Sequence, residues 1–450
     1  MRQVKSIKSL CEYIWSIEEK YDLLDFDIQG VKPWQAMRVT IYYELAQELG
    51  IYSLPHTKFS YKDKIINLFS IVKNSLIYNP FFLKKSDALV FPHSRTVNIE
   101  GKYIDIYSDF LINELRDSNV NVSVLEFFYL GKHNAQKNSY KKYMDFFCLS
   151  NLIVKPFFTC RLSKKERKFL FVLENEIFSE TGVKINFNQK FECFVREFRA
   201  LSYQFELLFN KIKAETIYLI VSYEKSAIIS VARKLGIKVV EIQHGTFSQY
   251  HLGYSFPARS KPLDYFPDEF YVWDDFWKNL IKLPIPSNNI KNYGFKYLEY
   301  EKNKYTDFKK QKNRIIVLSQ GVLGDQLANT LLENFSVFKD MDVYYKLHPG
   351  EYARWHQYRV LIELSKLSNF TVLTECNLYE EFSKSEFMAG VFSTAIYEGD
   401  MFGCKPMLFD LPGIEYMDTY IKSHSLERYG SIFINPEDLK LESDETCSVI

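Results

Sequence analysis

The strongest constraint on the fold is an alternation of short apolar runs with helical patterns, which occurs twice along the chain. The first series begins with DALVFPH at 87–93 and ends with DEFYVWD at 268–274. The second begins with RIIVLSQ at 314–320 and ends with KPMLFD at 405–410. Strands that alternate with helices form parallel sheets, because each helix carries the chain back to the edge where the next strand starts. The sequence therefore predicts an α/β protein with two Rossmann-like, doubly wound parallel sheets.

The same pattern divides the chain into three expected parts. Apolar residues in 1–85 recur at three- and four-residue spacing, which predicts a helical N-terminal region. The polar, charged stretch at 299–314 suits a linker between the two series. We therefore expect a first Rossmann-like domain at 86–300 and a second at 301–450. A length of 450 residues agrees with two or three domains.

Composition excludes several classes of protein. The net charge of +1, from 57 basic and 56 acidic residues, lacks the basic excess of a nucleic-acid binder, so no nucleic-acid partner is expected. Seven scattered cysteines form no CxxC pair and are interpreted as reduced thiols rather than metal ligands. Asp274 and Asp275 are interpreted as helix caps. The chain begins without a signal peptide or transmembrane run, so we expect a cytoplasmic protein, or one at the inner face of the cytoplasmic membrane.

The first motif that can carry chemistry is EIQHGTFSQYHLGYSFP at 241–257. An apolar strand delivers Gln243 and His244 into a loop rich in polar and aromatic residues, among them Tyr254. A histidine at the end of a strand can exchange protons near neutral pH, so His244 is a candidate acid/base, with Gln243 and Tyr254 as acceptor contacts. The alternative is that His244 caps the strand by bonding to a carbonyl.

The second motif is YYKLHPGE at 344–351, where His348 again follows an apolar strand. Lys346 and His348 alternate along the chain, so their side chains lean to one face and can meet a phosphate. Pro349 prevents continuation of regular structure. The alternative is an ordinary turn with a surface histidine.

Two further loops carry residues that suit the binding of a nucleotide. In GVFSTAIYEGDMFGCKP at 390–406, Ser393 and Thr394 stand where a strand gives way to a helix, and free N–H groups there bind anions. Glu398 lies one helical turn later and can reach a ribose hydroxyl. The alternative treats Ser393 as a plain helix cap and Glu398 as a solvated side chain.

The loop LSQGVLGDQL at 318–327 adds Ser319 and Gln320 as a wall of the same pocket, although it lacks the spacing of a nucleotide phosphate loop. A fifth segment, HSRTVNIEGKYIDIYSDFL at 93–111, offers Arg95 as an acceptor contact and Asp105 as a catalytic carboxylate. In that segment Asp109 is equally suited to starting a helix.

Together these motifs resemble bacterial capsule and lipopolysaccharide glycosyltransferases of GT-B fold. QHG after one strand, KLHP after a later strand, and FSTAIYEG with GCKP downstream are similar to polysialyltransferase-like and capsule Kdo transferase-like proteins. The resemblance implies two sheets facing a cleft, an acceptor bound by the first domain and a nucleotide-sugar donor bound by the second. CMP is one candidate for the nucleotide of that donor, and no metal or other cofactor is expected. It also implies that His348, Ser393 and Thr394 bind the donor phosphate. Teichoic-acid polymerases share related histidine loops and implicate both histidines, which gives His244 and His348 catalytic roles.

Three alternatives remain open at this stage. A polyol-phosphate transferase of teichoic-acid type, a non-catalytic nucleotide-sugar binding subunit of a polysaccharide assembly complex, and a nucleotide-sugar epimerase would all suit the same two-sheet fold. The segment 57–85 combines six lysines with bulky apolar residues. It is interpreted either as a peripheral membrane contact that finds a glycolipid acceptor, or as a stretch whose apolar face packs on the first sheet.

Overall fold

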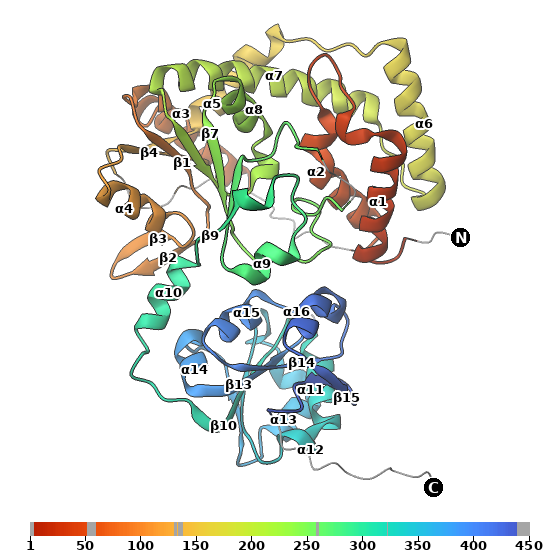
Figure 1. Cartoon of the computed structure of the whole chain (residues 1–450), viewed down its shortest axis with the longest axis vertical. Coiled ribbons are helices and arrows are strands. Elements are labelled where there is room, and N and C mark those ends of the chain that lie inside the picture. Colours follow the sequence, from red (N-terminus) through yellow and green to blue (C-terminus); the bar gives the residue numbers. More distant parts are fainter. Residues whose placement is uncertain are drawn as a thin grey trace. The chain divides into compact units, whose positions relative to one another are not determined.

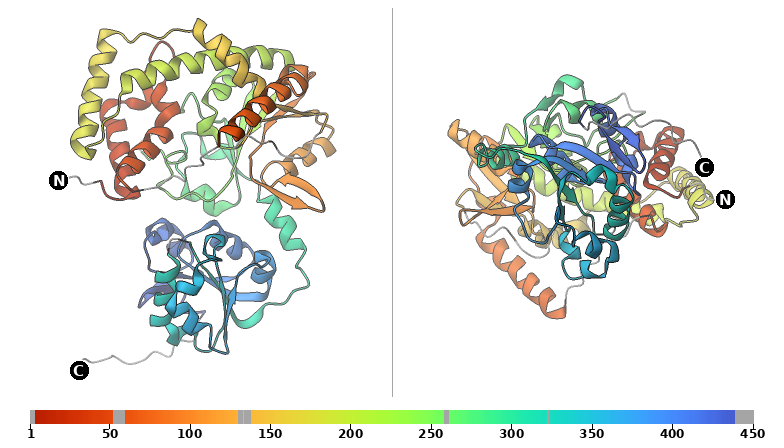
Figure 2. Two further views of the ribbon diagram at one scale, coloured as in Figure 1. Left: turned by 180° about the vertical axis from the view of Figure 1, so that it is seen from behind. Right: turned by 90° about the horizontal axis from the view of Figure 1, so that it is seen from below.

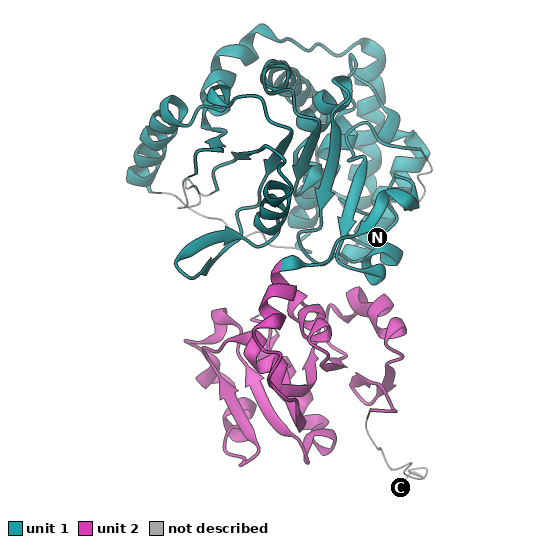
Figure 3. Cartoon of the chain, turned by 60° about the vertical axis from the view of Figure 1, so that its left-hand side comes forward, with its two compact units in different colours: residues 1–296 teal, residues 297–450 magenta. Residues whose placement is uncertain are grey.

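The computed structural model describes residues 4–51, 60–129, 133, 138–257, 261–321 and 323–438. Its contacts divide the chain into two compact units, Met1–Lys296 (unit 1) and Tyr297–Ile450 (unit 2), coloured separately in Figure 3. Within the described ranges, no helix is both long and apolar enough to cross a membrane.

Unit 1 is built on a sheet of seven parallel strands in the order β5-β4-β1-β6-β7-β8-β9 (Figure 1). The strands are β1 (Ala88–Phe91), β4 (Val122–Glu126), β5 (Lys141–Tyr143), β6 (Thr216–Leu219), β7 (Lys238–Ile242), β8 (Glu269–Val272) and β9 (Ile290–Asn292). An antiparallel hairpin of β2 (Thr96–Ile99) and β3 (Lys102–Asp105) follows β1. Periodicity did not reveal this hairpin.

Nine α-helices belong to the described part of this unit, and the first three of them lie in the N-terminal region. They are α1 (Ile7–Tyr21), α2 (Pro33–Glu48), α3 (Tyr61–Ile77), α4 (Asp109–Asp117), α5 (Asp145–Val154), α6 (Lys164–Thr181), α7 (Phe187–Ile212), α8 (Ser226–Lys234) and α9 (Asp275–Leu280). In the described part of 1–85, α1, α2 and α3 confirm the predicted helical character of the N-terminal region. The expected cap is confirmed at Asp274, whose carboxylate accepts the Phe276 N–H at 2.9 Å where α9 begins.

Unit 2 contains a second seven-stranded sheet in the order β12-β11-β10-β13-β14-β16-β15. The first five strands of that order are parallel and the last two are antiparallel additions. The strands are β10 (Gln311–Leu318), β11 (Asp342–Lys346), β12 (Phe370–Leu373), β13 (Ser385–Gly390), β14 (Lys405–Phe409), β15 (Glu427–Tyr429) and β16 (Ile432–Ile434). The helices are α10 (Lys296–Asn303), α11 (Gly324–Glu333), α12 (Phe335–Phe338), α13 (Arg359–Leu364), α14 (Leu378–Lys384), α15 (Thr394–Met401) and α16 (Asp418–Ser423).

The linker prediction for 299–314 is wrong at both ends of the segment. Residues up to Asn303 belong to α10, and β10 already starts at Gln311. Lysines and glutamates suit an exposed helix as well as they suit a linker, so composition did not separate the two.

Both sheets place the first strand of their series near the centre, and this position decides where ligands can bind. In unit 1 the chain leaves β1 towards β4 and β5, then returns to β6 on the other side of β1. In unit 2 it leaves β10 towards β11 and β12 and returns to β13. Right-handed crossovers then put helices on opposite faces of each sheet, so the prediction of two doubly wound sheets is confirmed. Such sheets bind ligands at the carboxyl ends of the strands where the order reverses.

Candidate functional site

The reversal point of unit 1 brings two histidines together from segments far apart in the sequence. His93 follows β1 and His244 follows β7, and their rings stack with centroids 5.9 Å apart. Tyr107, from the loop before α4, meets the His244 ring edge-on at 6.4 Å. The predicted site residue His244 therefore lies among aromatic rings, at the edge of the sheet where a Rossmann-type fold binds its ligand.

A buried carboxylate orients His244 through a tyrosine. The Tyr254 hydroxyl lies 2.5 Å from Oε1 of Glu241 and 3.3 Å from Nδ1 of His244. A phenol carries one proton, and the shorter contact directs it to Glu241, so the phenol oxygen accepts the Nδ1 proton of His244. The lone pair of the neutral imidazole is then on Nε2. This arrangement leaves His244 able to accept a proton from a ligand.

The electrostatics of this group favour neutral forms. Burial, with the charges of His251, His93 and Lys225, lowers the pKa of His244 to about 3. Burial raises the pKa of Glu241 to about 7, although its hydrogen bonds oppose the rise. Burial also lowers the pKa of Lys225, which follows β6 in the same edge of the sheet. Near neutral pH, His244 is thus uncharged while Glu241 is poised to lose or hold its proton.

The N-terminal helices hold the loop that carries Tyr254. Arg38 on α2 donates to the Leu252 carbonyl and forms a buried ion pair with Glu18 on α1, with Nη2 to Oε2 at 2.9 Å. The Arg38 guanidinium also lies over the Phe256 ring at 4.2 Å. The helical N-terminal region therefore stabilises the loop that follows β7.

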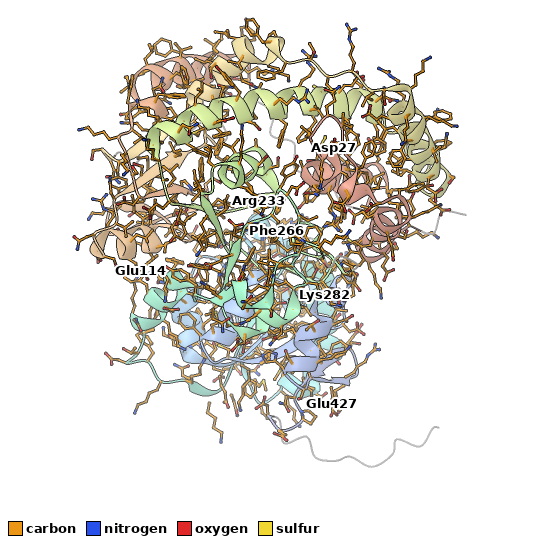
Figure 4. All side chains as sticks on the ribbon, turned by 45° about the horizontal axis from the view of Figure 1, so that its top comes forward. Asp27, Glu114, Arg233, Phe266, Lys282 and Glu427 are labelled. Atoms are coloured by element: carbon orange, nitrogen blue, oxygen red, sulfur yellow. The ribbon has the colours of Figure 1, made fainter. Side chains whose placement is uncertain are left out.

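A second arginine fixes the later part of the same loop. Arg233 on α8 donates to the carbonyls of Leu263 at 2.7 Å and Phe266 at 2.9 Å, and Figure 4 shows Arg233 close to Phe266. The carbonyl of Lys282 accepts the Phe256 N–H at 3.0 Å. The long segment between β7 and β8 is thus held at several points along its length.

The remaining residues predicted in unit 1 lie close to this group. Asp105 is buried and accepts hydrogen bonds from the N–H groups of His93 at 2.8 Å and Tyr107 at 3.0 Å, and from the Ser108 hydroxyl at 2.5 Å. Burial raises its pKa to about 7. Through these hydrogen bonds, Asp105 fixes the conformation of the loop that carries His93. Its catalytic role stays a prediction.

Arg95 and Gln243, two of the three expected acceptor contacts, differ in exposure. Arg95 is exposed and donates to the Tyr107 hydroxyl at 3.0 Å. Gln243 is fully buried, and its amide bonds to the Gly245 carbonyl and the Trp273 N–H, both at 2.9 Å. Gln243 therefore ties the ends of β7 and β8 together, and an acceptor contact by either residue stays a prediction.

In unit 2 a second buried glutamate joins the loops after β10 and β11. Glu351 is fully buried, and its carboxylate accepts from the Ser319 hydroxyl at 3.0 Å and the His348 N–H at 2.8 Å. Nδ1 of His348 accepts the Gly350 N–H at 3.1 Å. Because Nδ1 is an acceptor, the neutral ring carries its proton on Nε2. His348 is exposed, so it presents a hydrogen-bond donor at the carboxyl edge of the sheet.

The other predicted residues of these loops take up neighbouring positions. Lys346, the last residue of β11, donates to the Tyr352 hydroxyl at 2.9 Å and to the Leu347 carbonyl at 2.5 Å. Gln320 donates to the Phe392 carbonyl, which links the loop after β10 to the loop after β13. The loop after β10 therefore contacts both the loop after β11 and the loop after β13.

The loop after β13 leads into the N-terminus of the helix α15. Ser393 precedes α15, and its side chain makes no capping hydrogen bond. Thr394 opens the helix, and Glu398 is buried within it, 3.5 Å from the Tyr379 hydroxyl. The interpretation of Ser393 as a plain cap is wrong in this structure, because a capping side chain would accept an N–H of the first turn.

Reading the sequence alone missed three residues of these arrangements. Glu241 lies inside an apolar strand, and a charge there was a signal that could have been read. Glu351 follows His348 by three residues, the spacing of a capping box. His93 was within the quoted segment but was not singled out. Among the described residues, no group of three or more His, Cys, Asp or Glu side chains is arranged to hold a metal ion.

The fold and these strand-end residues define a two-sheet α/β protein of Rossmann type. Similar solved structures include a UDP-GlcNAc 2-epimerase from Methanocaldococcus jannaschii (10% identity, TM-score 0.42, 78% of this chain and 94% of that one). MurG from Acinetobacter baumannii (10%, 0.40, 75% and 84%) and a UDP-GlcNAc 2-epimerase from Neisseria meningitidis bound to UDP-GlcNAc (13%, 0.39, 71% and 80%) are also similar. No family model and no curated protein sequence matches the chain.

Proposed function

We propose that the protein is a glycosyltransferase that moves a sugar from a nucleotide-activated donor to a glycan or glycolipid acceptor of a capsule or lipopolysaccharide. The observation that carries the proposal is that both sheets present an oriented histidine at the carboxyl ends of their strands. His244 offers a proton acceptor, and His348 offers a hydrogen-bond donor. Transfer of a sugar needs both functions.

Unit 2 suits the phosphate of the donor. The Nε2–H of His348, the Lys346 ammonium and the N-terminal turn of α15 behind Ser393 supply donors and positive charge from adjacent loops. Donors of this kind stabilise the negative charge that develops on the leaving nucleotide. Glu398 is assigned to the ribose, and Ser319 and Gln320 to the wall of the donor pocket.

Unit 1 suits activation of the acceptor. The acceptor hydroxyl gives its proton to Nε2 of His244, and its oxygen forms the new bond to the anomeric carbon. The bond between that carbon and the phosphate oxygen breaks, and the electron pair leaves with the nucleotide. Burial lowers the pKa of His244 to about 3 and so disfavours the imidazolium that results. In this scheme an ionised Glu241, acting through Tyr254, offsets that cost as the proton is transferred. No metal is required in this scheme, because protein groups neutralise the phosphate.

The first test is binding of nucleotides to the whole protein. We expect CMP, UDP or GDP, or one of their sugars, to raise the thermal unfolding midpoint, and His348→Ala and Ser393→Ala to weaken that effect. Phe171→Ser, at an exposed position on α6, is the control. Failure of every nucleotide to stabilise the wild-type protein would reject the proposal.

The second test separates the alternatives by their products. A glycosyltransferase consumes donor only when acceptor is present, whereas an epimerase converts the donor alone. A polyol-phosphate transferase leaves a phosphodiester in the product, which phosphorus NMR detects. A non-catalytic binding subunit predicts that His244→Ala keeps full function, whereas the mechanism above predicts loss of turnover with nucleotide binding retained.

A further inference from the structure

The helix α3 of unit 1 is amphipathic, but its polar face packs against the protein and its apolar face is exposed. The seam that packs inward contains Asn67, Ser70, Ile71 and Asn74, at the three- and four-residue spacing of one helical face. Asn74 donates to the Asp145 carboxylate at the start of α5 at 3.2 Å. Residues 57–59 of the basic segment lie outside the described residues. For α3 itself, the expectation that its apolar face packs on the first sheet is wrong, because its large apolar side chains are exposed.

The outward side of α3 is strongly apolar. Phe69 is 70% exposed, Leu76 71%, Leu68 57% and Ile65 54%. Figure 2 shows α3, in orange-red, lying on the outside of unit 1. A surface helix normally buries its apolar face and leaves its polar face in water. An inverted helix therefore indicates that another apolar phase covers the outer face.

The neighbouring helix continues the same kind of surface. α5 packs along α3, and its last turn exposes Leu152 (74%) and Ile153 (70%). Phe157, just after α5, is 83% exposed. The end of α5 thus adds exposed apolar side chains on an element that packs against α3, and large exposed apolar surfaces on soluble units mark interaction sites. We call α3 together with residues 152–157 the apolar ridge.

The lysines of the ridge favour a lipid bilayer over a protein as its partner. Lys62 and Lys73 lie seven residues before and four residues after Phe69, so they share its face of the helix. Lys84 and Lys85 are also exposed a short way along the chain. The buried core of a protein interface is depleted in lysine, which must be desolvated there. At a bilayer surface, lysine stems lie among the lipids while the ammonium groups reach anionic headgroups.

We propose that the apolar ridge binds the surface of an anionic lipid bilayer. The aromatic and aliphatic side chains enter the boundary between headgroups and acyl chains, and Lys62 and Lys73 pair with lipid phosphates. The ridge needs no nucleotide and no residue of the strand-end loops, so the proposal is independent of the proposed function.

Co-sedimentation of the full chain with vesicles tests this proposal. We expect binding to vesicles that contain phosphatidylglycerol, much weaker binding to pure phosphatidylcholine, and a decline as salt is raised. The double variant Leu68→Ser/Phe69→Ser removes two adjacent exposed side chains and should lower the partition coefficient roughly tenfold or more. Lys62→Gln/Lys73→Gln should reduce binding to anionic vesicles and flatten the salt dependence.

A matched control lies on α6. Phe171 is 61% and Val172 44% exposed, so Phe171→Ser/Val172→Ser removes a similar adjacent pair away from the ridge and should leave binding unchanged. Thermal unfolding of each variant confirms that it is folded.

Three results would overturn the proposal. The wild-type protein could stay in the supernatant with anionic vesicles, or the α6 control could lose binding as much as the α3 variant. The third is a dimer in light scattering that Leu68→Ser/Phe69→Ser converts to a monomer, because a second copy of the chain would then cover the ridge.

Discussion

Gly324 is the position where one added methyl group tests the arrangement of unit 2 most directly. It begins α11, and a Cβ placed on it would lie 1.8 Å from Oε1 of Glu351. The same oxygen accepts the Ser319 hydroxyl at 3.0 Å, and the other carboxylate oxygen accepts the His348 N–H at 2.8 Å. The Glu351 carboxylate cannot move away from the methyl group without giving up these bonds. Gly324→Ala should therefore detach the loops after β10 and β11 from each other.

The expected magnitude follows from two opposing effects. Alanine is favoured over glycine inside a helix by about 1 kcal/mol, which would stabilise the variant. Two hydrogen bonds to a buried carboxylate are lost, at about 1.5–3 kcal/mol each. Gly324→Ala should then lower the free energy of unfolding of unit 2 by roughly 2–5 kcal/mol, in spite of its better helix propensity.

Urea unfolding and amide hydrogen exchange measure this effect. Exchange in 324–333 should accelerate, because those residues form α11, and nucleotide affinity should fall because His348 loses its support. Gly245→Ala is the control, since a Cβ there meets nothing within 4 Å. If Gly324→Ala is as stable as the wild-type protein and exchanges at the same rate, Glu351 does not hold these loops.

Three further changes test the buried charges of unit 1. Burial raises the pKa of Glu241 from 4.5 to about 7 in the folded protein. Ionising this carboxyl therefore lowers the free energy of unfolding as pH rises above 4.5, by about 3 kcal/mol above pH 7. Glu241→Gln should stabilise the protein at pH 8 and not at pH 4.5, as measured by urea unfolding. Burial opposes charge on His133, but bonds to Asp145 and Glu126 raise its pKa above 6.5 overall. Its contribution is therefore complete below pH 6.5 and lost as pH rises, and His133→Phe should destabilise more at pH 5.5 than at pH 9. Arg38→Met leaves the carboxylate of Glu18 buried without its cation and should lower the free energy of unfolding by about 3–5 kcal/mol, a prediction that a wild-type-like urea midpoint would contradict.

The strand and helix pattern could be predicted because it depends on local periodicity. The run at 87–93 contains β1, and α4 begins at Asp109, the residue named as its possible start. Parallel pairing then determines that the motif loops share one edge of each sheet. The two histidine loops could therefore be placed at strand ends without knowledge of their contacts, whereas the order of the strands was not predicted.

Tertiary contacts decided the features that periodicity could not supply. The stretch 354–367 contains only one short helix, α13 (Arg359–Leu364), preceded by a 3-10 turn. The periodicity of α3 predicted a helix, but not that Asn67 and Asn74 would face the protein. Which side of an amphipathic helix is covered depends on the partner surface, and a single sequence does not contain that information.

The two buried glutamates show how each sheet positions its histidine. Glu241 accepts the Ser222 N–H at 3.0 Å from the loop after β6, while it binds Tyr254 on the way to His244. Glu351 accepts the Ser319 hydroxyl and the His348 N–H from two adjacent loops. In both units a carboxylate without solvent exposure joins two neighbouring strand-end loops, and the histidine beside it has one ring nitrogen committed to the protein. A buried carboxylate is costly, so its presence twice at the carboxyl edge is explained better by the need to orient a histidine than by stability. Replacing either glutamate by glutamine should therefore change ligand chemistry as well as stability.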